Sequence, residues 1–146
     1  PARVAGWFYL MAAAVLGVCL MSGYQLQTWG LVSTSPSRSA FLTGLCVILV
    51  PFISAALFRR ALVLPAVVGA VIGVGGLYLL TGAGAAQGSL LGDGLTLGCA
   101  LAFAFHIALT ERYAARFPPF ALVAAQLVVT AGVFALIAPL GSLRVA

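Results

Sequence analysis

The sequence predicts an all-α integral membrane protein, a polytopic bundle of about five transmembrane helices. Of its 146 residues, 64% are hydrophobic and only 6% are charged. A soluble globular domain carries about 25% charged residues because it must wet its surface. Seven arginines and two acidic residues cannot cover a water-facing surface of this size. The mean hydropathy of +1.22 indicates the same class, so we expect the lipid bilayer to be the chain's main partner.

Five apolar runs have the length of membrane spans. About 20 helical residues cross a hydrocarbon core of roughly 30 Å, and lipid admits only helices or closed barrels as spanning structures. No run alternates polar and apolar residues as a barrel strand does, which leaves helices. The predicted spans are Gly6–Gly30, Ser37–Phe58, Leu64–Leu80, Gly92–Leu109 and Phe120–Leu140.

Prolines and glycines mark the joints between these spans. Pro36 follows a Ser-Thr-Ser run and suits the first position of the second helix, and Pro65 and Pro119 suit similar positions in later helices. The glycine-rich stretch 82–89 is the predicted boundary between two parts of the chain. Pro51 lies midway through the second span, where the missing backbone donor predicts a helix kink.

The arginines predict how the chain is oriented. If five spans alternate in direction, five arginines share one side of the membrane and two share the other. The positive-inside rule then places the chain start and the Arg59-Arg60 loop in the cytoplasm of a multi-pass plasma-membrane protein. The larger set is Arg3, Arg59, Arg60, Arg112 and Arg116, and the smaller set is Arg38 and Arg144.

Several function classes have no support in the residues. The arginines form no basic stripe with aromatic platforms, so we expect no nucleic-acid partner. Cys19, Cys46 and Cys99 form no CxxC pair and are interpreted as small buried hydrophobes. There is one histidine, no paired carboxylates, no HExxH, no GxSxG and no phosphate-binding glycine loop. We therefore expect no metal, no cofactor and no enzymatic activity.

Polar side chains inside the bilayer are the candidate functional residues, because their burial in lipid is costly. His106 has two interpretations, substrate contact or proton exchange on one hand and a structurally satisfied neutral histidine on the other. Gln126 lies at nearly the same depth on the next span, where it could hydrogen-bond His106. Gln25 and Gln27 point to different sides of the first helix, so only one of them can line a narrow path.

Two further features concern helix ends and helix packing. Asp93 opens the fourth span, where an acid complements the positive helix end and is expected to cap it. Gly69 and Gly73 form a GxxxG pattern that lets another helix approach closely. That helix belongs either to the same chain or to a second copy in a homodimer.

Taken in order, these motifs resemble the EamA-type transporters of the drug/metabolite transporter superfamily. The resemblance covers nearly the whole chain and depends on the order and spacing of short strings, none of which is specific alone. The strings are Gln27–Leu31, Thr34-Ser35, Ser39–Leu45, Pro51, Gly69–Leu80, Gly92-Asp93, Ala102–Ile107 with Glu111-Arg112, and Gln126.

The resemblance implies a ten-helix carrier made of two five-helix inverted repeats, of which this chain holds helices three to seven. Residues 1–82 would then end the first repeat, 83–91 would join the repeats, and 92–146 would begin the second. Such carriers bind a small-molecule substrate near the midplane and expose it alternately to each side. We expect secondary active transport of a small metabolite or drug-like compound, by the complete carrier and not by five helices alone. The implied pathway candidates are Gln25, Gln27, Thr43, Ser54, Phe103, His106 and Gln126.

Three alternatives differ in class. One is a membrane scaffold or assembly subunit with no transport cycle. Another is a membrane-embedded enzyme whose catalytic groups lie in other parts of a longer chain. The third, a small four-helix multidrug pump, requires an intramembrane glutamate in an early helix, and none is present.

Overall fold

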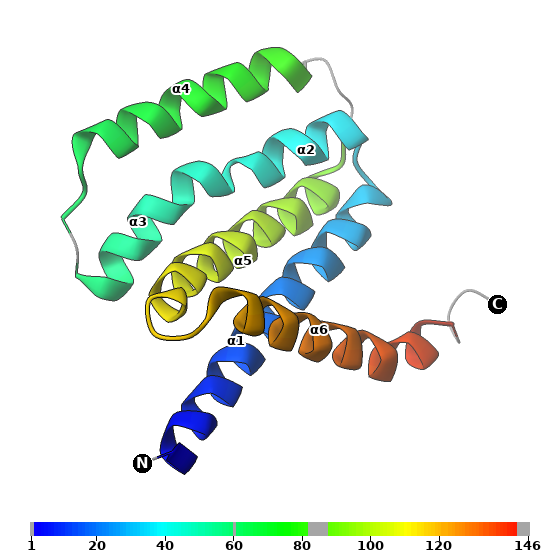
Figure 1. Cartoon of the computed structure of the whole chain (residues 1–146). Coiled ribbons are helices and arrows are strands. Elements are labelled where there is room, and N and C mark those ends of the chain that lie inside the picture. Colours follow the sequence, from blue (N-terminus) through cyan, green and yellow to red (C-terminus); the bar gives the residue numbers. More distant parts are fainter. Residues whose placement is uncertain (1, 60, 82–87, 143–146) are drawn as a thin grey trace. The chain divides into compact units, whose positions relative to one another are not determined.

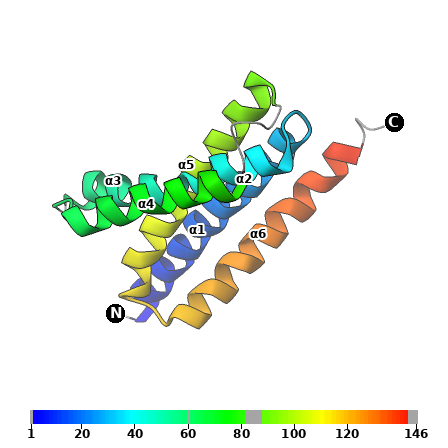
Figure 2. The same cartoon turned by 90° about the horizontal axis from the view of Figure 1, so that it is seen from above.

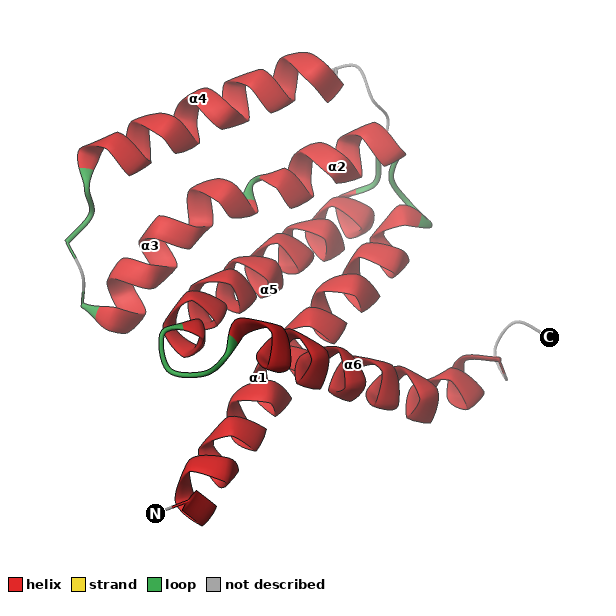
Figure 3. Ribbon diagram, viewed as in Figure 1, coloured by secondary structure: helices red, strands yellow, loops and turns green. Residues whose placement is uncertain are grey.

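The computed structural model describes residues 2–59, 61–81 and 88–142. Arg60, Arg144 and residues 83–87 of the predicted inter-repeat segment lie outside this described part. Its regular structure is helical (Figure 3), which confirms the all-α polytopic class. The helices, labelled in Figure 1, are α1 Ala2–Leu31, α2 Pro36–Gly44, α3 Cys46–Phe58, α4 Leu64–Thr81, α5 Leu90–Ala114 and α6 Pro119–Ser142.

Four stretches of the described residues are long and apolar enough to cross a membrane. They match the first, second, fourth and fifth predicted spans within a few residues at most ends, although α5 continues five residues beyond the predicted Leu109. The remaining predicted span, Leu64–Leu80, is α4, whose apolar stretch Leu64–Leu79 is shorter than the other four. At 1.5 Å per residue the 18 residues of α4 rise about 27 Å, close to a hydrocarbon core of roughly 30 Å.

Two helices begin where the local sequence favours a start. Ser35 is the N-cap of α2, with extended backbone angles (φ −74°, ψ 151°), and its hydroxyl accepts a hydrogen bond from the Arg38 amide at 3.3 Å. Pro36 follows at the first helical position, as predicted. Pro119 opens α6 in the same way.

The second span is interrupted at Leu45, and the predicted kink at Pro51 stays a prediction. Pro51 lies inside α3, whereas Leu45 ends α2 and caps α3. The Leu45 amide donates to the Leu42 carbonyl at 3.2 Å, and the Ile48 amide donates to the Leu45 carbonyl at 3.0 Å, which are bonds of a tightened turn. Gly44 stands beside this break, and the space that a side chain would fill there is occupied by Leu77 of α4.

The described residues form two compact units. The first contains residues up to 21 and from 109 onward. Its core is Ala12, Leu16 and Leu122, each at most 1% exposed, with partly buried aromatic side chains against it. The Tyr9 hydroxyl donates to the Ala121 carbonyl at 2.6 Å, and the Thr130 hydroxyl donates to the Gly17 carbonyl at 3.1 Å. These bonds fasten α6 to the first half of α1.

The second unit contains residues 22–108, and its helices position the candidate site. Helix α4 packs along α2 and α3, as Figures 1 and 2 both show. Phe41 and Tyr78 make an edge-to-face contact across that interface, with ring centroids 5.7 Å apart. Among the described residues nothing lies within 4 Å of a Cβ built on Gly69 or Gly73. The predicted homodimer through this GxxxG face of α4 stays a prediction.

Candidate functional site

Within the second unit, α5 presents a stripe of small, polar and aromatic residues. Its members recur every three or four positions, so they share one helix face. The first three are buried and the last two are half-buried: Gly92, Thr96, Cys99, Phe103 and His106. We call this set the α5 stripe.

The last turns of α1 lie close against the α5 stripe. A Cβ on Gly30 would lie 2.5 Å from the Thr96 hydroxyl oxygen and 3.0 Å from the Gly92 carbonyl oxygen, so no larger residue fits without a shift. Farther along, Phe103 meets the ring of Tyr24 edge to face, with centroids 5.3 Å apart. This close approach brings Gln27, which lies between Gly30 and Tyr24 in the sequence, level with the middle of the stripe.

A polar contact joins three helices at that level. The Gln27 amide nitrogen lies 3.4 Å from the Thr43 hydroxyl oxygen on α2, within hydrogen-bonding range. The same hydroxyl lies 4.0 Å from the Cys99 sulfur on α5, and either atom could donate. Gln27 and Thr43, both predicted pathway residues, are therefore brought together. Cys99 completes the group as a weak sulfur donor or acceptor, beyond the purely apolar role that the sequence suggested.

Ser39 extends this polar surface along α2. It precedes Thr43 by four residues, so the two share a face, and it is 1% exposed. Within the described residues its hydroxyl has no hydrogen-bond partner, and the same holds for the hydroxyl of Ser54 on α3. A buried hydroxyl without a partner is unfavourable by about 1–3 kcal/mol. Both hydroxyls therefore have unused hydrogen-bonding capacity.

For the other predicted pathway residues, the described part of the structure gives no hydrogen bond with Gln27 or Thr43. Phe103 contacts Tyr24, and His106 follows it by one turn on the α5 stripe. Gln25 is half-buried on α1. Gln126 is buried in α6 of the first unit, whereas His106 belongs to the second. The predicted hydrogen bond between His106 and Gln126 stays a prediction.

At the N-terminal ends of α2 and α5, an ion pair fastens the two helices. The Arg38 guanidinium grips the Asp93 carboxylate in a bidentate manner, with Nε 2.8 Å from Oδ1 and Nη2 2.7 Å from Oδ2. The Thr34 hydroxyl donates to the same carboxylate at 3.1 Å. We call Arg38, Asp93 and Thr34 the clasp.

Asp93 lies in the first turn of α5, as expected for an acid near the positive helix end, but the expected capping role is wrong. Helix α5 begins three residues earlier, at Leu90, and the Ser89 hydroxyl accepts the Gly92 amide at 3.0 Å as its N-cap bond. The Asp93 carboxylate is directed to Arg38 and Thr34 instead. A guanidinium that donates two hydrogen bonds binds a carboxylate more strongly than a single backbone amide does.

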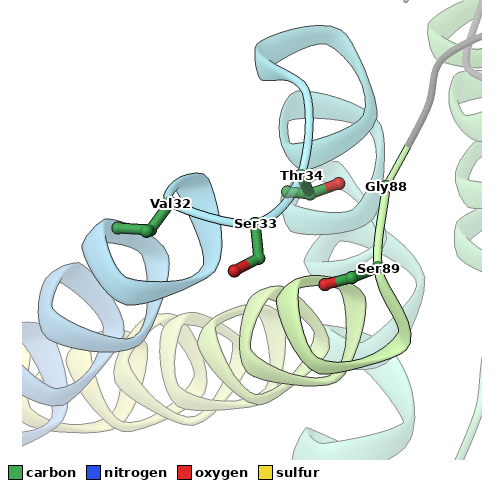
Figure 4. A pocket seen from close by; sticks show the side chains of 5 residues that line it. All are labelled: Val32, Ser33, Thr34, Gly88 and Ser89. Atoms are coloured by element: carbon green, nitrogen blue, oxygen red, sulfur yellow. The ribbon is translucent and has the colours of Figure 1, made fainter.

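The loops beside the clasp are joined by backbone contacts. The Ser89 amide donates to the Ser33 carbonyl at 2.9 Å, and Thr34 and Gly88 form an antiparallel bridge. A shallow pocket of 460 Å³ opens there, between the loop after α1 and the start of α5 (Figure 4). Its lining residues are Val32, Ser33, Thr34, Gly88 and Ser89.

Sequence reasoning missed the clasp although a signal was present. Alternating spans put Arg38 and the start of the fourth span on the same side of the membrane, so Asp93 could have been paired with the arginine there. Ser39 and Cys99 had no comparable signal. Their role depends on which faces of α2 and α5 meet, and periodicity within one helix does not determine that.

Comparison with known proteins finds a similarity over part of the chain. A curated protein of Archaeoglobus fulgidus named "Uncharacterized transporter" is 34% identical over 98 residues, which is 67% of this chain and 31% of that protein. The chain thus spans about a third of the length of the curated relative it matches. No protein-family model matches the chain, and no solved structure matches it. Two thirds of the chain is therefore similar to part of a protein that carries a transporter name.

Proposed function

We propose that this chain is part of a secondary active transporter of the EamA type, which moves a small metabolite or drug-like compound across the plasma membrane by alternating access. The observation that carries the proposal is the contact between Gln27 and Thr43 inside an apolar helical unit. Polar side chains within a membrane span are costly and often mark substrate pathways. Gln27 lies near one end of the predicted span Gly6–Gly30. The similarity to a protein with a transporter name supports the same class.

The chemistry around Gln27 suits an amphipathic substrate. The Gln27 amide both donates and accepts hydrogen bonds, and Thr43 and Ser39 add hydroxyl groups. The paired rings of Tyr24 and Phe103 add an apolar wall. In this proposal the amide and hydroxyls replace the water around the substrate's polar part while the rings cover its apolar part. His106, one turn beyond Phe103, then contacts substrate or exchanges a proton.

The clasp supplies a gate in the same proposal. Arg38 belongs to the predicted first repeat (1–82) and Asp93 to the predicted second repeat (92–146). Alternating access requires the repeats to separate on one side while they stay closed on the other. The bidentate ion pair would hold the ends of α2 and α5 together in one state and break in the other. With Arg59 cytoplasmic, this gate would face the outside.

Transport by the full-length protein in proteoliposomes tests the proposal. Uptake of radiolabelled amino acids and of amphipathic drug-like cations is measured with and without an imposed proton gradient. We expect saturable, gradient-dependent uptake of at least one class. Gln27→Leu should lower that uptake about tenfold, the effect of losing one hydrogen bond of about 1.4 kcal/mol.

Thr28→Val is the matched control. Thr28 is exposed on the same helix, and its hydroxyl bonds the Tyr24 carbonyl of its own helix, at 2.8 Å. Its removal should leave uptake unchanged. A membrane scaffold would give no flux above empty liposomes for any compound. Equal uptake by the wild type and by Gln27→Leu would show that Gln27 does not line the substrate pathway.

A further inference from the structure

The first unit contains a groove between α1 and the turn that joins α5 to α6. Its volume is 270 Å³. One wall consists of Phe8, Met11, Ala12 and Val15, whose spacing places them on a single face of α1. The facing wall consists of Tyr113, Arg116 and Phe117. The groove is thus apolar along α1 and carries one cation at the turn.

Packing beneath the groove fixes its shape. Ala12, in the α1 wall, is 1% exposed, and the Phe117 ring contacts the Tyr9 ring edge to face, with centroids 5.4 Å apart. The amides of Arg116 and Phe117 both donate to the Tyr113 carbonyl, at 2.9 and 3.0 Å. A pre-formed groove of this kind binds without first having to order its walls.

The walls differ in chemistry in a way that matches one class of ligand. Phe8 is 60% exposed, Met11 48% and Val15 40%, so this face of α1 is open to an apolar occupant. Arg116 is exposed, and no described residue forms a hydrogen bond or ion pair with its guanidinium. Guanidinium groups bind phosphate oxygens in a bidentate manner. An apolar helix laid in the groove would leave this charge unmatched.

We infer that the groove binds one anionic phospholipid, with an acyl chain along Phe8–Val15 and the phosphate on Arg116. The seven-residue rise from Phe8 to Val15 covers about 10 Å, which carries a chain from the predicted membrane edge into the hydrocarbon. Basic pockets between transmembrane helices bind acidic lipid headgroups by this combination of contacts. The inference does not depend on the proposed transport activity.

Native mass spectrometry of the detergent-purified full-length protein tests it. The probes are phosphatidylglycerol and phosphatidylcholine with identical acyl chains, and free glycerol phosphate serves as a competitor. We expect phosphatidylglycerol to bind about tenfold more tightly than phosphatidylcholine, in line with one charge-assisted contact. Arg116→Gln should remove that preference and Arg116→Lys should keep most of it. Glycerol phosphate should not compete, because it lacks the acyl chain.

Two control variants separate the groove from general effects. Arg59→Gln removes the same charge outside the groove and should keep the preference. Val15→Trp should weaken the binding of both lipids, because the larger side chain fills the groove. Leu10→Trp, at an exposed position outside the groove lining, should leave the binding of both lipids unchanged. Equal affinity for the two lipids, or an unchanged preference in Arg116→Gln, would overturn the inference. Displacement by glycerol phosphate would assign the site to free phosphate compounds instead.

Discussion

At the scale of single residues, the clearest structural result is that opposite charges 55 positions apart meet across two helices. The pair is also tied to the backbone around it, because Thr34 bonds the carboxylate and bridges Gly88. The proposed gate requires this pair to form and break during each cycle. Loss of the pair should therefore change transport more than it changes membrane insertion.

A charge swap tests the gate. Arg38→Asp and Asp93→Arg each place two like charges together, so each single variant should lower transport severalfold while the protein still inserts. The double variant restores opposite charges and should recover most of the activity. Uptake is measured together with the amount of protein in the membrane. An equal loss of uptake in the two single variants and in the double variant would mean that the identity of each residue matters, and not the attraction between their charges.

The residues that can be predicted from sequence are those with strong local chemistry. Gln27 and Thr43 stand out as polar groups in apolar runs, and the structure brings them together. Cys99 and Ser39 do not stand out, since cysteine and serine are common in membrane helices. For Asp93 the local rule for helix ends predicts the wrong partner, because an ion pair between helices prevails over it.

At the scale of helices, α1 approaches α5 closely at glycine positions, of which Gly30 is the one against the buried Thr96. A Cβ on Gly30 would lie 2.5 Å from the Thr96 hydroxyl oxygen, whereas nothing described lies within 4 Å of a Cβ on Gly94. Gly30→Ala should lower the free energy of unfolding by about 1–3 kcal/mol through overpacking. Gly94→Ala should raise it by up to about 1 kcal/mol through helix propensity. Unfolding in mixed detergent micelles measures the free energy of unfolding of both variants. A loss smaller than about 1 kcal/mol in Gly30→Ala would contradict the close packing.

The end of α3 contains a strained residue. Arg59 has a left-handed backbone (φ 51°, ψ 37°), which is costly for a residue with a side chain. Arg59→Gly should raise the free energy of unfolding by about 1 kcal/mol. Arg59→Asn, which also tolerates this conformation, separates backbone relief from loss of charge. Arg59→Val should be less stable than the wild type, and the reverse order in the same unfolding assay would exclude the left-handed conformation.

Helix starts are easier to predict from sequence than helix interruptions. Pro36 and Pro119 mark starts because proline fits the first helical position and few others. For the second span the sequence predicts a kink at Pro51, since proline is the strongest single breaker. The structure adds a break at Leu45, which the sequence does not predict, and there Leu77 of α4 fills the space beside Gly44. Contacts between helices of this kind cannot be predicted from one helix alone.

At the scale of the whole molecule, orientation follows from a few arginines. Labelling with a membrane-impermeant maleimide tests it, after Cys19, Cys46 and Cys99 are replaced by alanine. Arg59→Cys should react only when cells are permeabilised, since that loop is predicted to be cytoplasmic. Leu90→Cys, at the exposed start of α5, should react in intact cells. The opposite pattern would invert the topology and move the clasp to the cytoplasmic side.

Solvation of these helices by acyl chains is the condition on which the whole fold depends, and extraction of the full-length protein tests it most directly. Isolated membranes are washed with alkaline carbonate, and the pellet is then divided between plain buffer and a mild detergent. We predict that the protein stays in the pellet through the wash and becomes monodisperse and helical only in detergent. Recovery of a folded, monodisperse species in buffer without detergent would contradict the membrane fold and, with it, the proposed pathway and gate.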